Sequence, residues 1–294
     1  MQVKIAGAPI SWGVCEVPGW GYQMSPERVL AEMSSLGLTA TEFGPDGFLP
    51  IDPLQKAEFL SHHKIRAIGG FYPILLHDPT NDPIPAVTAE LDSYEAAGAA
   101  VLVLAASTGV DGYDATKPVL TPSQWATLFE NLSKVSDLAK QRGVKAVVHP
   151  HVGTLIETRE DIEQVLAGTS IGFCLDTGHM LIGGTDPVQF SKDHSDRIQH
   201  SHLKDVNLQV AEKVRSGKLS YYEAVKQGLY TPLGQGDVDV RSIIKNLMAA
   251  NYQGWFTLEQ DNVVDADPAA GSGPVSDATM SVEFINKVAS EFAA

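Results

Sequence analysis

The feature that most constrains the fold of this chain is a series of short apolar segments, each followed by a longer stretch with helical periodicity. Segments such as 99–105 (AAVLVLA) are too short to be core helices and are typical of buried strands. Strands that alternate with helices favour an α/β fold with a parallel sheet. We expect strands at 3–10, 38–43, 65–72, 99–105, 145–148, 171–175, 198–203 and 254–261.

Eight such units in 294 residues predict one (β/α)8 TIM barrel, and we expect a single domain over residues 1–294. Helix signals recur between the strands, including a capping box at 121–124 (TPSQ). The stretch 208–230, before the last strand, is predicted to be a helical insertion. A doubly wound open sheet is the competing fold, but it would carry a glycine-rich phosphate loop after the first strand, and the GAPISWG segment there lacks that pattern.

The charge and the cysteine content limit the partners and the compartment. The net charge is −15 at pH 7 with no basic run, which argues against nucleic acid or an anionic membrane as a partner, because binding phosphate needs clustered Lys and Arg. The chain has no signal-peptide pattern at its amino terminus and no apolar window of about 18 residues. Only two cysteines occur, Cys15 and Cys174, so we expect a cytoplasmic protein. Cys174 lies inside a strand and is predicted to be a small core residue.

Four successive strands end in residues that can bind a metal ion, namely His149 or His151, Asp176, His202 and Glu259. The carboxyl ends of barrel strands meet at one mouth, so these side chains are expected to converge. Carboxylate and imidazole ligands without thiolate suit Mn²⁺, Co²⁺, Fe²⁺ or Zn²⁺. The alternative is a polar mouth without metal, in which Asp176 caps a helix and His179 is a buried, hydrogen-bonded side chain.

Other polar and aromatic residues also follow predicted strands. Trp12 lies in a loop rich in Gly, Pro and Trp after the first strand, and Glu42 ends the second strand. Such loops commonly carry binding residues, and we expect Trp12 and Glu42 to contact the substrate. A solvated loop glutamate is the alternative for Glu42. Lys204 follows the seventh strand and is a candidate proton donor.

Several motifs together resemble a known family. The segments CLDTGH, HSHLKD, HPHVGT, PLGQGDVD and GWFTLEQD are similar to the xylose isomerase-like sugar isomerase/epimerase superfamily. More narrowly, they resemble its inosose dehydratase and inosose isomerase branch from inositol catabolism. APISW and TEFGP are similar to that branch too, so the resemblance covers almost the whole chain.

The resemblance implies a divalent metal held by an acid, Asp, His and an acid from strands five to eight. The last three positions fall on Asp176, His202 and Glu259. At the first position this chain departs from the family's pattern, because His149 replaces the usual glutamate; we take His149 as the ligand, with His151 and Glu157 as the nearby alternatives. Manganese is the favoured ion.

The resemblance also implies the chemistry. Substrate contacts are expected from His151 and His179. A base, Glu259 or Glu157, would remove the α proton of a polyol ketone to give an enediolate. Loss of a hydroxyl with help from an acid, His179 or Lys204, would make the enzyme a dehydratase, and return of the proton elsewhere an isomerase.

The residues alone leave other functions open. The substrate implied is a small polyol ketone, an inosose, with a ketose or sugar-phosphate isomerase or epimerase as the alternative. A metal-dependent phosphodiesterase would share the barrel, but the net charge of −15 argues against a DNA substrate. A non-catalytic sugar-binding barrel is disfavoured by the retained ligands. The sequence does not decide whether the chain forms a homo-oligomer.

Overall fold

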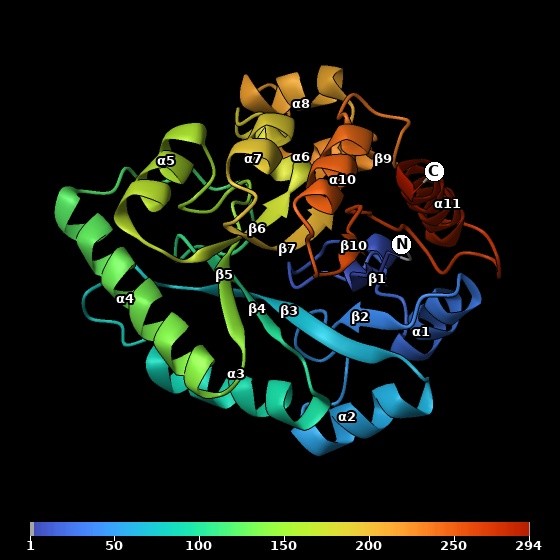
Figure 1. Ribbon diagram of the computed structural model, residues 1–294, viewed down its shortest axis with the longest axis horizontal. Helices are drawn as coiled ribbons and strands as arrows, with labels where there is room; N and C mark the ends of the chain where they lie inside the picture. The colour runs from blue at the N-terminus through green and yellow to red at the C-terminus, as the bar shows by residue number, and fades with distance from the viewer. Residues whose placement is uncertain (1–2, 294) are drawn as a thin grey trace.

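A computed structural model describes residues 3–293 of the chain. Eight parallel strands close into a barrel in the order β1-β10-β7-β6-β5-β4-β3-β2 (Figure 1). The predicted (β/α)8 fold is therefore confirmed. The barrel strands are β1 (Ile5–Gly7), β2 (Ala40–Glu42), β3 (Arg66–Ile74), β4 (Val101–Ala106), β5 (Lys145–Val148), β6 (Gly172–Asp176), β7 (Ile198–Leu203) and β10 (Phe256–Leu258).

Helices surround the barrel (Figure 1). Their starts follow the signals in the sequence: Thr121 and Gln124 form the predicted capping box of α4, and Thr158 caps α5 through the amide of Asp161. Apart from the short α6 (Thr177–Ile182) and the helices of the insertion, the α-helices of the described residues are α1 (Pro26–Ser35), α2 (Pro53–His62), α3 (Ile84–Ala97), α4 (Pro122–Gln141), α5 (Arg159–Gly168), α7 (Pro187–Asp193), α10 (Val240–Ala249) and α11 (Pro274–Ala293).

The barrel strands at the two ends of the chain are shorter than predicted. β1 ends at Gly7, and a 3-10 turn (Pro9–Trp12) follows, with proline at its first position. β10 stops at Leu258, so Glu259 lies just beyond the strand and not within it. At the second of these ends, Glu259, Gln260 and Asp261 therefore belong to the loop that follows the strand.

The insertion before β10 contains the predicted helices, α8 (Leu208–Arg215) and α9 (Tyr221–Lys226), and also a small sheet that the sequence did not predict. In this sheet β8 (Asp205–Val206) pairs antiparallel with β9 (Tyr230–Thr231). The Asp205 carboxylate accepts hydrogen bonds from the amides of Gly234 and Gly236, at 2.7 and 3.0 Å. A Cβ on Gly236 would lie 2.3 Å from this carboxylate, which explains the glycine in the PLGQGD segment.

The barrel interior is apolar in its middle layer and polar toward the carboxyl ends of the strands. Val103, Val147 and Cys174 form a small buried apolar layer on neighbouring strands. Nearer the carboxyl ends of the strands, the buried interior residues are charged or polar, including Glu42 and His202. This gradient places ionisable groups at the mouth without exposing the core. In the described part of the chain, no helix combines the length and apolarity needed to cross a membrane.

Candidate active site

Four buried side chains gather at the barrel mouth. His149 follows β5, Asp176 ends β6, His202 lies in β7 and Glu259 follows β10; each offers one ligand atom within 4.8 Å of the others. Oδ2 of Asp176 lies 3.3 Å from Nε2 of His149 and 3.7 Å from Nδ1 of His202. Nδ1 of His202 is 2.6 Å from Oε2 of Glu259. The convergence expected from the strand ends is therefore present, and of the two histidines after β5 it is His149 that joins it.

Asp176 is placed both to cap a helix and to bind a metal ion, the two roles that its sequence motif allowed. One oxygen, Oδ1, caps the short helix α6 (Thr177–Ile182) by accepting the amides of Gly178 and His179 at 2.9 and 2.8 Å. The other oxygen, Oδ2, faces His149 and His202. Burial opposes ionisation of Asp176, but the ammonium of Lys204 and the neighbouring imidazoles outweigh it and hold the pKa of the carboxyl well below its usual range. The helix cap therefore orients a carboxylate whose second oxygen is available as a ligand.

Glu42 supports this cluster from the opposite side of the barrel. Its Oε1 accepts hydrogen bonds from Nε2 of both His200 and His202, at 2.7 and 2.8 Å. Burial raises the pKa of Glu42, but the charges and hydrogen bonds of the two histidines outweigh it and lower the pKa below its usual value. Because Nε2 of His202 is engaged, the nitrogen that faces Asp176 and Glu259 is Nδ1. That Glu42 contacts the substrate stays a prediction: the carboxylate borders the cavity, and it also orients His202.

Lys204 is a buried ammonium, 1% exposed, surrounded by carboxylates. Its Nζ lies 2.5 Å from Oδ1 of Asp261, 2.9 Å from Oε2 of Glu259 and 3.6 Å from Oδ2 of Asp176. Burial opposes the charge, but Asp261 and the other carboxylates outweigh it and raise the pKa of Lys204 well above its usual value. Lys204 therefore carries a proton at the site.

Two site residues were missed by the sequence analysis. Asp261 binds Lys204 and accepts a hydrogen bond from the hydroxyl of Tyr221 at 2.5 Å. The available signal was the position of Asp261 two residues beyond Glu259 in GWFTLEQD. Tyr221 starts a helix of the insertion, and its sequence context carries no comparable signal. It reaches the site because the small β8–β9 sheet folds the insertion over the mouth.

His151 and His179 lie beside the cluster as a stacked pair. Their ring centroids are 3.7 Å apart, and the Tyr113 ring lies 4.3 Å from that of His151. Burial, together with the charge of neighbouring cations, lowers the pKa of both histidines well below the usual value. Both imidazoles are therefore neutral near pH 7.

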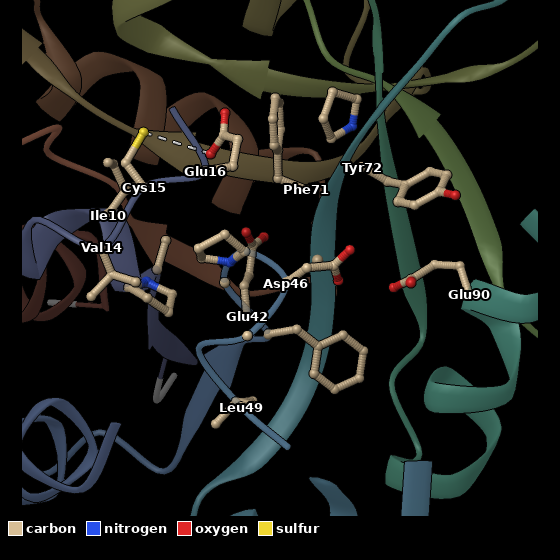
Figure 2. Close-up of a pocket in the computed structure, with 18 of the residues that line it drawn as sticks. Ile10, Val14, Cys15, Glu16, Glu42, Asp46, Leu49, Phe71, Tyr72 and Glu90 are labelled. Carbon is tan, nitrogen blue, oxygen red and sulfur yellow. Dashed lines mark hydrogen bonds between the residues drawn. The ribbon is translucent and has the colours of Figure 1, made fainter. Parts of the chain in front are cut away.

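A cavity of about 790 Å³ opens beside His151. Acidic side chains surround it, and Figure 2 shows Glu16, Glu42, Asp46 and Glu90 among its walls. Of the predicted catalytic and substrate-binding residues, Glu42, His151, Lys204 and Glu259 border the cavity. Its volume is within the range of small-molecule sites.

Trp12 and Glu157 are placed differently from the expectation. Trp12 is fully buried against α1, where its Nε1 donates to Glu32 at 2.9 Å. Trp20, and not Trp12, is among the described residues that line the cavity, so the prediction for Trp12 is wrong. Glu157 is also absent from that lining. Burial raises the pKa of Glu157, and the charge of nearby Lys117 offsets part of this rise.

The four-residue cluster fits a divalent metal. Nδ1 of His202 lies 2.6 Å from Oε2 of Glu259 in a geometry that makes no hydrogen bond, and Nδ1 has no other hydrogen-bond partner in residues 3–293, whereas Oε2 is also paired with the Lys204 ammonium at 2.9 Å. Two buried polar atoms that approach each other without hydrogen bonding cost free energy unless a third group satisfies both. Two imidazoles and two carboxylates are a donor set suited to Mn²⁺, Fe²⁺, Co²⁺ or Zn²⁺.

Comparison with known proteins agrees with this architecture. Residues 30–283 match the family described as xylose isomerase-like TIM barrel. The chain belongs to the xylose isomerase-like TIM barrel family. Among its relatives in this family, the inosose dehydratase of Geobacillus thermodenitrificans is 34% identical over 277 residues and 91% of each chain. The inosose dehydratase of Clostridium tetani is 30% identical over 98% of each chain.

Solved structures of other proteins share the fold. One is described as the IOLI protein with a binding zinc atom, with a TM-score of 0.71, 15% identity and 99% coverage of both chains. Another is L-ribulose 3-epimerase, with a TM-score of 0.71, 16% identity and coverage of 99% of this chain and 96% of that one. At such identities the likeness shows the fold alone. The resemblance inferred from the motifs is thus confirmed.

Proposed function

We propose that this protein is a metal-dependent inosose dehydratase of inositol catabolism. The observation that carries the proposal is the buried His149–Asp176–His202–Glu259 cluster, which borders the cavity through Glu259, in a chain related over most of its length to inosose dehydratases. Nδ1 of His202, which is buried without a hydrogen-bond partner among the described residues, supports a bound ion, for which manganese is our first choice. When bound, the ion supplies a Lewis acid that stabilises negative charge on a carbonyl oxygen.

Dehydration of a polyol ketone requires a base and an acid on the same cavity. Glu259 borders the cavity, so its carboxylate can take the α proton of a ketone held there. Lys204 borders the same cavity as an ammonium, and it can protonate the β-hydroxyl as the carbon–oxygen bond breaks. The α proton passes to Glu259, the hydroxyl leaves as water with the Lys204 proton, and a dione in its enol form remains.

Asp261 and the histidine pair complete this assignment. Asp261 and Tyr221 hold the Lys204 ammonium on the Glu259 side of the mouth. His151 borders the cavity with a neutral imidazole, which can bind substrate hydroxyls, and His179 supports its ring. The same groups support a second candidate, isomerisation or epimerisation of a ketose, because neutral His151 could carry the α proton to another position.

We also propose that the protein acts in the cytoplasm. Cys15 and Cys174 are both free thiols, as suits a reducing compartment. The partner is a small hydroxylated ketone, and the acidic surroundings of the cavity suit hydroxyl groups better than phosphate.

The test of function is exchange in heavy water. With a keto-inositol and Mn²⁺, the protein should catalyse exchange of an α hydrogen and then form a dehydrated dione with a new ultraviolet absorbance. Removal of metal by a chelator should abolish both reactions, and Mn²⁺ or Co²⁺ should restore them. Exchange with a pentulose or hexulose, and none with any inosose, would favour the epimerase. Full activity in metal-free protein would exclude both assignments.

A further inference from the structure

A buried thiol lies next to the proposed metal ligands. Cys174 stands in β6 two residues before Asp176, and alternation along the strand places both side chains on the interior face. In the register between β6 and β7, Cys174 is opposite His200 and Asp176 is opposite His202. The thiol therefore sits one layer below the carboxylate, between the apolar floor of Val103 and Val147 and the polar mouth.

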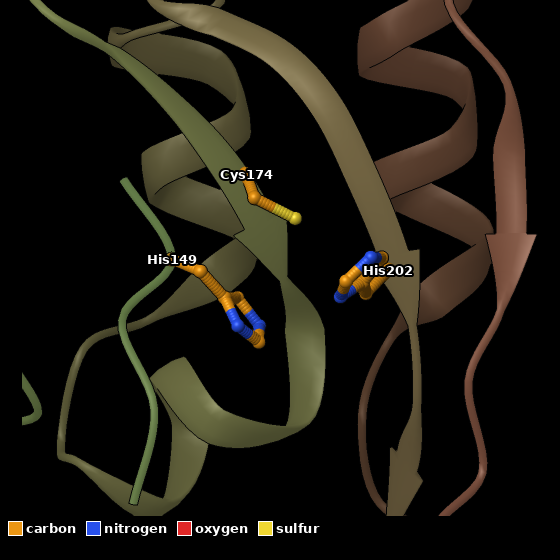
Figure 3. Close-up of side chains that lie close together, drawn as sticks. All are labelled: His149, Cys174 and His202. Atoms are coloured by element: carbon orange, nitrogen blue, oxygen red, sulfur yellow. The ribbon is translucent and has the colours of Figure 1, made fainter. Parts of the chain in front are cut away.

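Cys174 shares a compact space with two histidines. His149, Cys174 and His202 each offer a ligand atom within 4.8 Å of the other two, and all three are fully buried. Figure 3 shows the thiol on β6 and the two rings turned toward the same space between their strands. Nδ1 of His149 and Nδ1 of His202 are buried without a hydrogen-bond partner in residues 3–293. The space thus holds unsatisfied donors for an ion as well as a thiol.

We propose that His149, Cys174 and His202 form a second metal-binding set, selective for thiophilic ions such as Cd²⁺ and Zn²⁺. Thiolate and imidazole ligands favour soft and borderline ions, whereas hard ions such as Mn²⁺ favour carboxylate oxygens. On binding, the sulfur–hydrogen bond is replaced by a sulfur–metal bond, and the proton is released to solvent. The carboxylates of Asp176 and Glu259, which approach the same two imidazoles, serve the harder ion.

The two sets exclude each other because they share both imidazoles. An ion held by Cys174 occupies His149 and His202, which leaves only Asp176 and Glu259 of the set on which the proposed function rests. A thiophilic ion should therefore displace a harder ion from the mouth. The site would discriminate between metals by the depth at which each one binds, near the thiol or near the carboxylates.

The test is a titration of the full-length, metal-free protein with Cd²⁺. A sulfur-to-cadmium charge-transfer band should appear in the near ultraviolet and saturate at one equivalent. Cys174→Ala and Cys174→Ser should lose the band, whereas the matched control Cys15→Ala should keep it, because Cys15 lies on the cavity wall outside this cluster. Cadmium NMR of the parent protein reports sulfur ligation directly, so the test does not depend on the variants folding.

Mutual exclusion has its own measurement. Protein loaded with Mn²⁺ should release one Mn²⁺, detected by electron paramagnetic resonance, for each Cd²⁺ that binds. Absence of a sulfur band in the parent protein, or its loss in Cys15→Ala only, would overturn the thiol site. Growth of the band while Mn²⁺ stays bound would overturn the shared ligands. Failure of the protein to bind Mn²⁺ or act on inososes, with the cadmium band present, would count against the proposed function and leave the thiol site standing.

Discussion

The four proposed ligands lie in or just after strands β5, β6, β7 and β10, whereas the first half of the barrel, chiefly its loops, β3 and α3, supplies much of the cavity wall. The wall residues of the first half follow β2 and lie along β3 and α3, as with Asp46, Phe71 and Glu90 in Figure 2. The second half contributes His151, Lys204, Glu259 and Asp261 to the same wall. The proposed metal ligands thus come from the second half of the barrel, whereas both halves line the cavity.

Close approach of the backbone explains part of this difference. At Gly69 a Cβ would lie 2.3 Å from the carbonyl oxygen of Val101, and at Gly70 it would lie 3.2 Å from Phe43. β3 therefore carries glycine at both positions. Glu42, in β2, is a charged residue of the first half, and it crosses the barrel to bind His202. The comparison indicates that ligand variants should affect catalysis, wall variants should affect fit or stability, and Glu42 should affect metal binding.

The largest effect is expected from the ligands of the second half. Asp176→Asn, His202→Ala and Glu259→Gln should each lower turnover at least about 10³-fold, or about 4 kcal/mol, because each removes a metal contact. Thermal unfolding should change little, since residues at a barrel mouth serve function more than stability. Turnover and metal content should be measured together. Variants that retain metal as tightly as the parent protein would show that the ligand assignment is wrong.

In the first half, Trp12→Ala should act on stability. Trp12 is fully buried against α1, so its loss should lower the free energy of unfolding by about 3–5 kcal/mol. Urea unfolding measures this change, and a titration with Mn²⁺ should show unchanged affinity in the folded variant. A raised KM with unchanged stability would return Trp12 to the substrate site.

Glu42→Gln tests the one contact that joins the halves. A glutamine cannot accept from His200 and His202 as an ionised carboxylate does, so metal affinity should fall about 10- to 100-fold. Competition with a chromophoric chelator measures the affinity. Asp46→Asn, at an exposed carboxylate on the same cavity, is the matched control and should leave metal affinity unchanged. Equal affinities for both variants would remove Glu42 from the support of the site.

The smallest effect is expected at Glu157. Glu157→Gln should leave metal affinity unchanged and lower turnover by less than the roughly 10²-fold that loss of a general base costs. His149→Ala should lower metal affinity far more, because His149 lies in the cluster and Glu157 does not. Isothermal titration of both variants gives the ranking. The reverse order would make Glu157 the first ligand.

The sequence by itself determined which elements form and which residues end the strands. The strands predicted at 145–148 and 198–203 have the same limits in the structure, and Asp176, His202 and Glu259 stand at the strand ends as expected. These features depend on local periodicity and on capping residues, which act over a few neighbours in the chain. The choice of His149 over His151 rested on resemblance, and the geometry supports it.

Only the tertiary structure decided how distant side chains pair across the mouth. Glu42 meets His202 across 160 positions of the chain, and Asp261 meets Lys204 across 57. Barrel closure and register set these contacts, and neither leaves a trace in local periodicity. The same holds for Trp12, whose loop turns its ring toward Glu32 and away from the cavity. A strand pattern shows which face a side chain occupies, but the partner on that face is chosen by the strands that close around it.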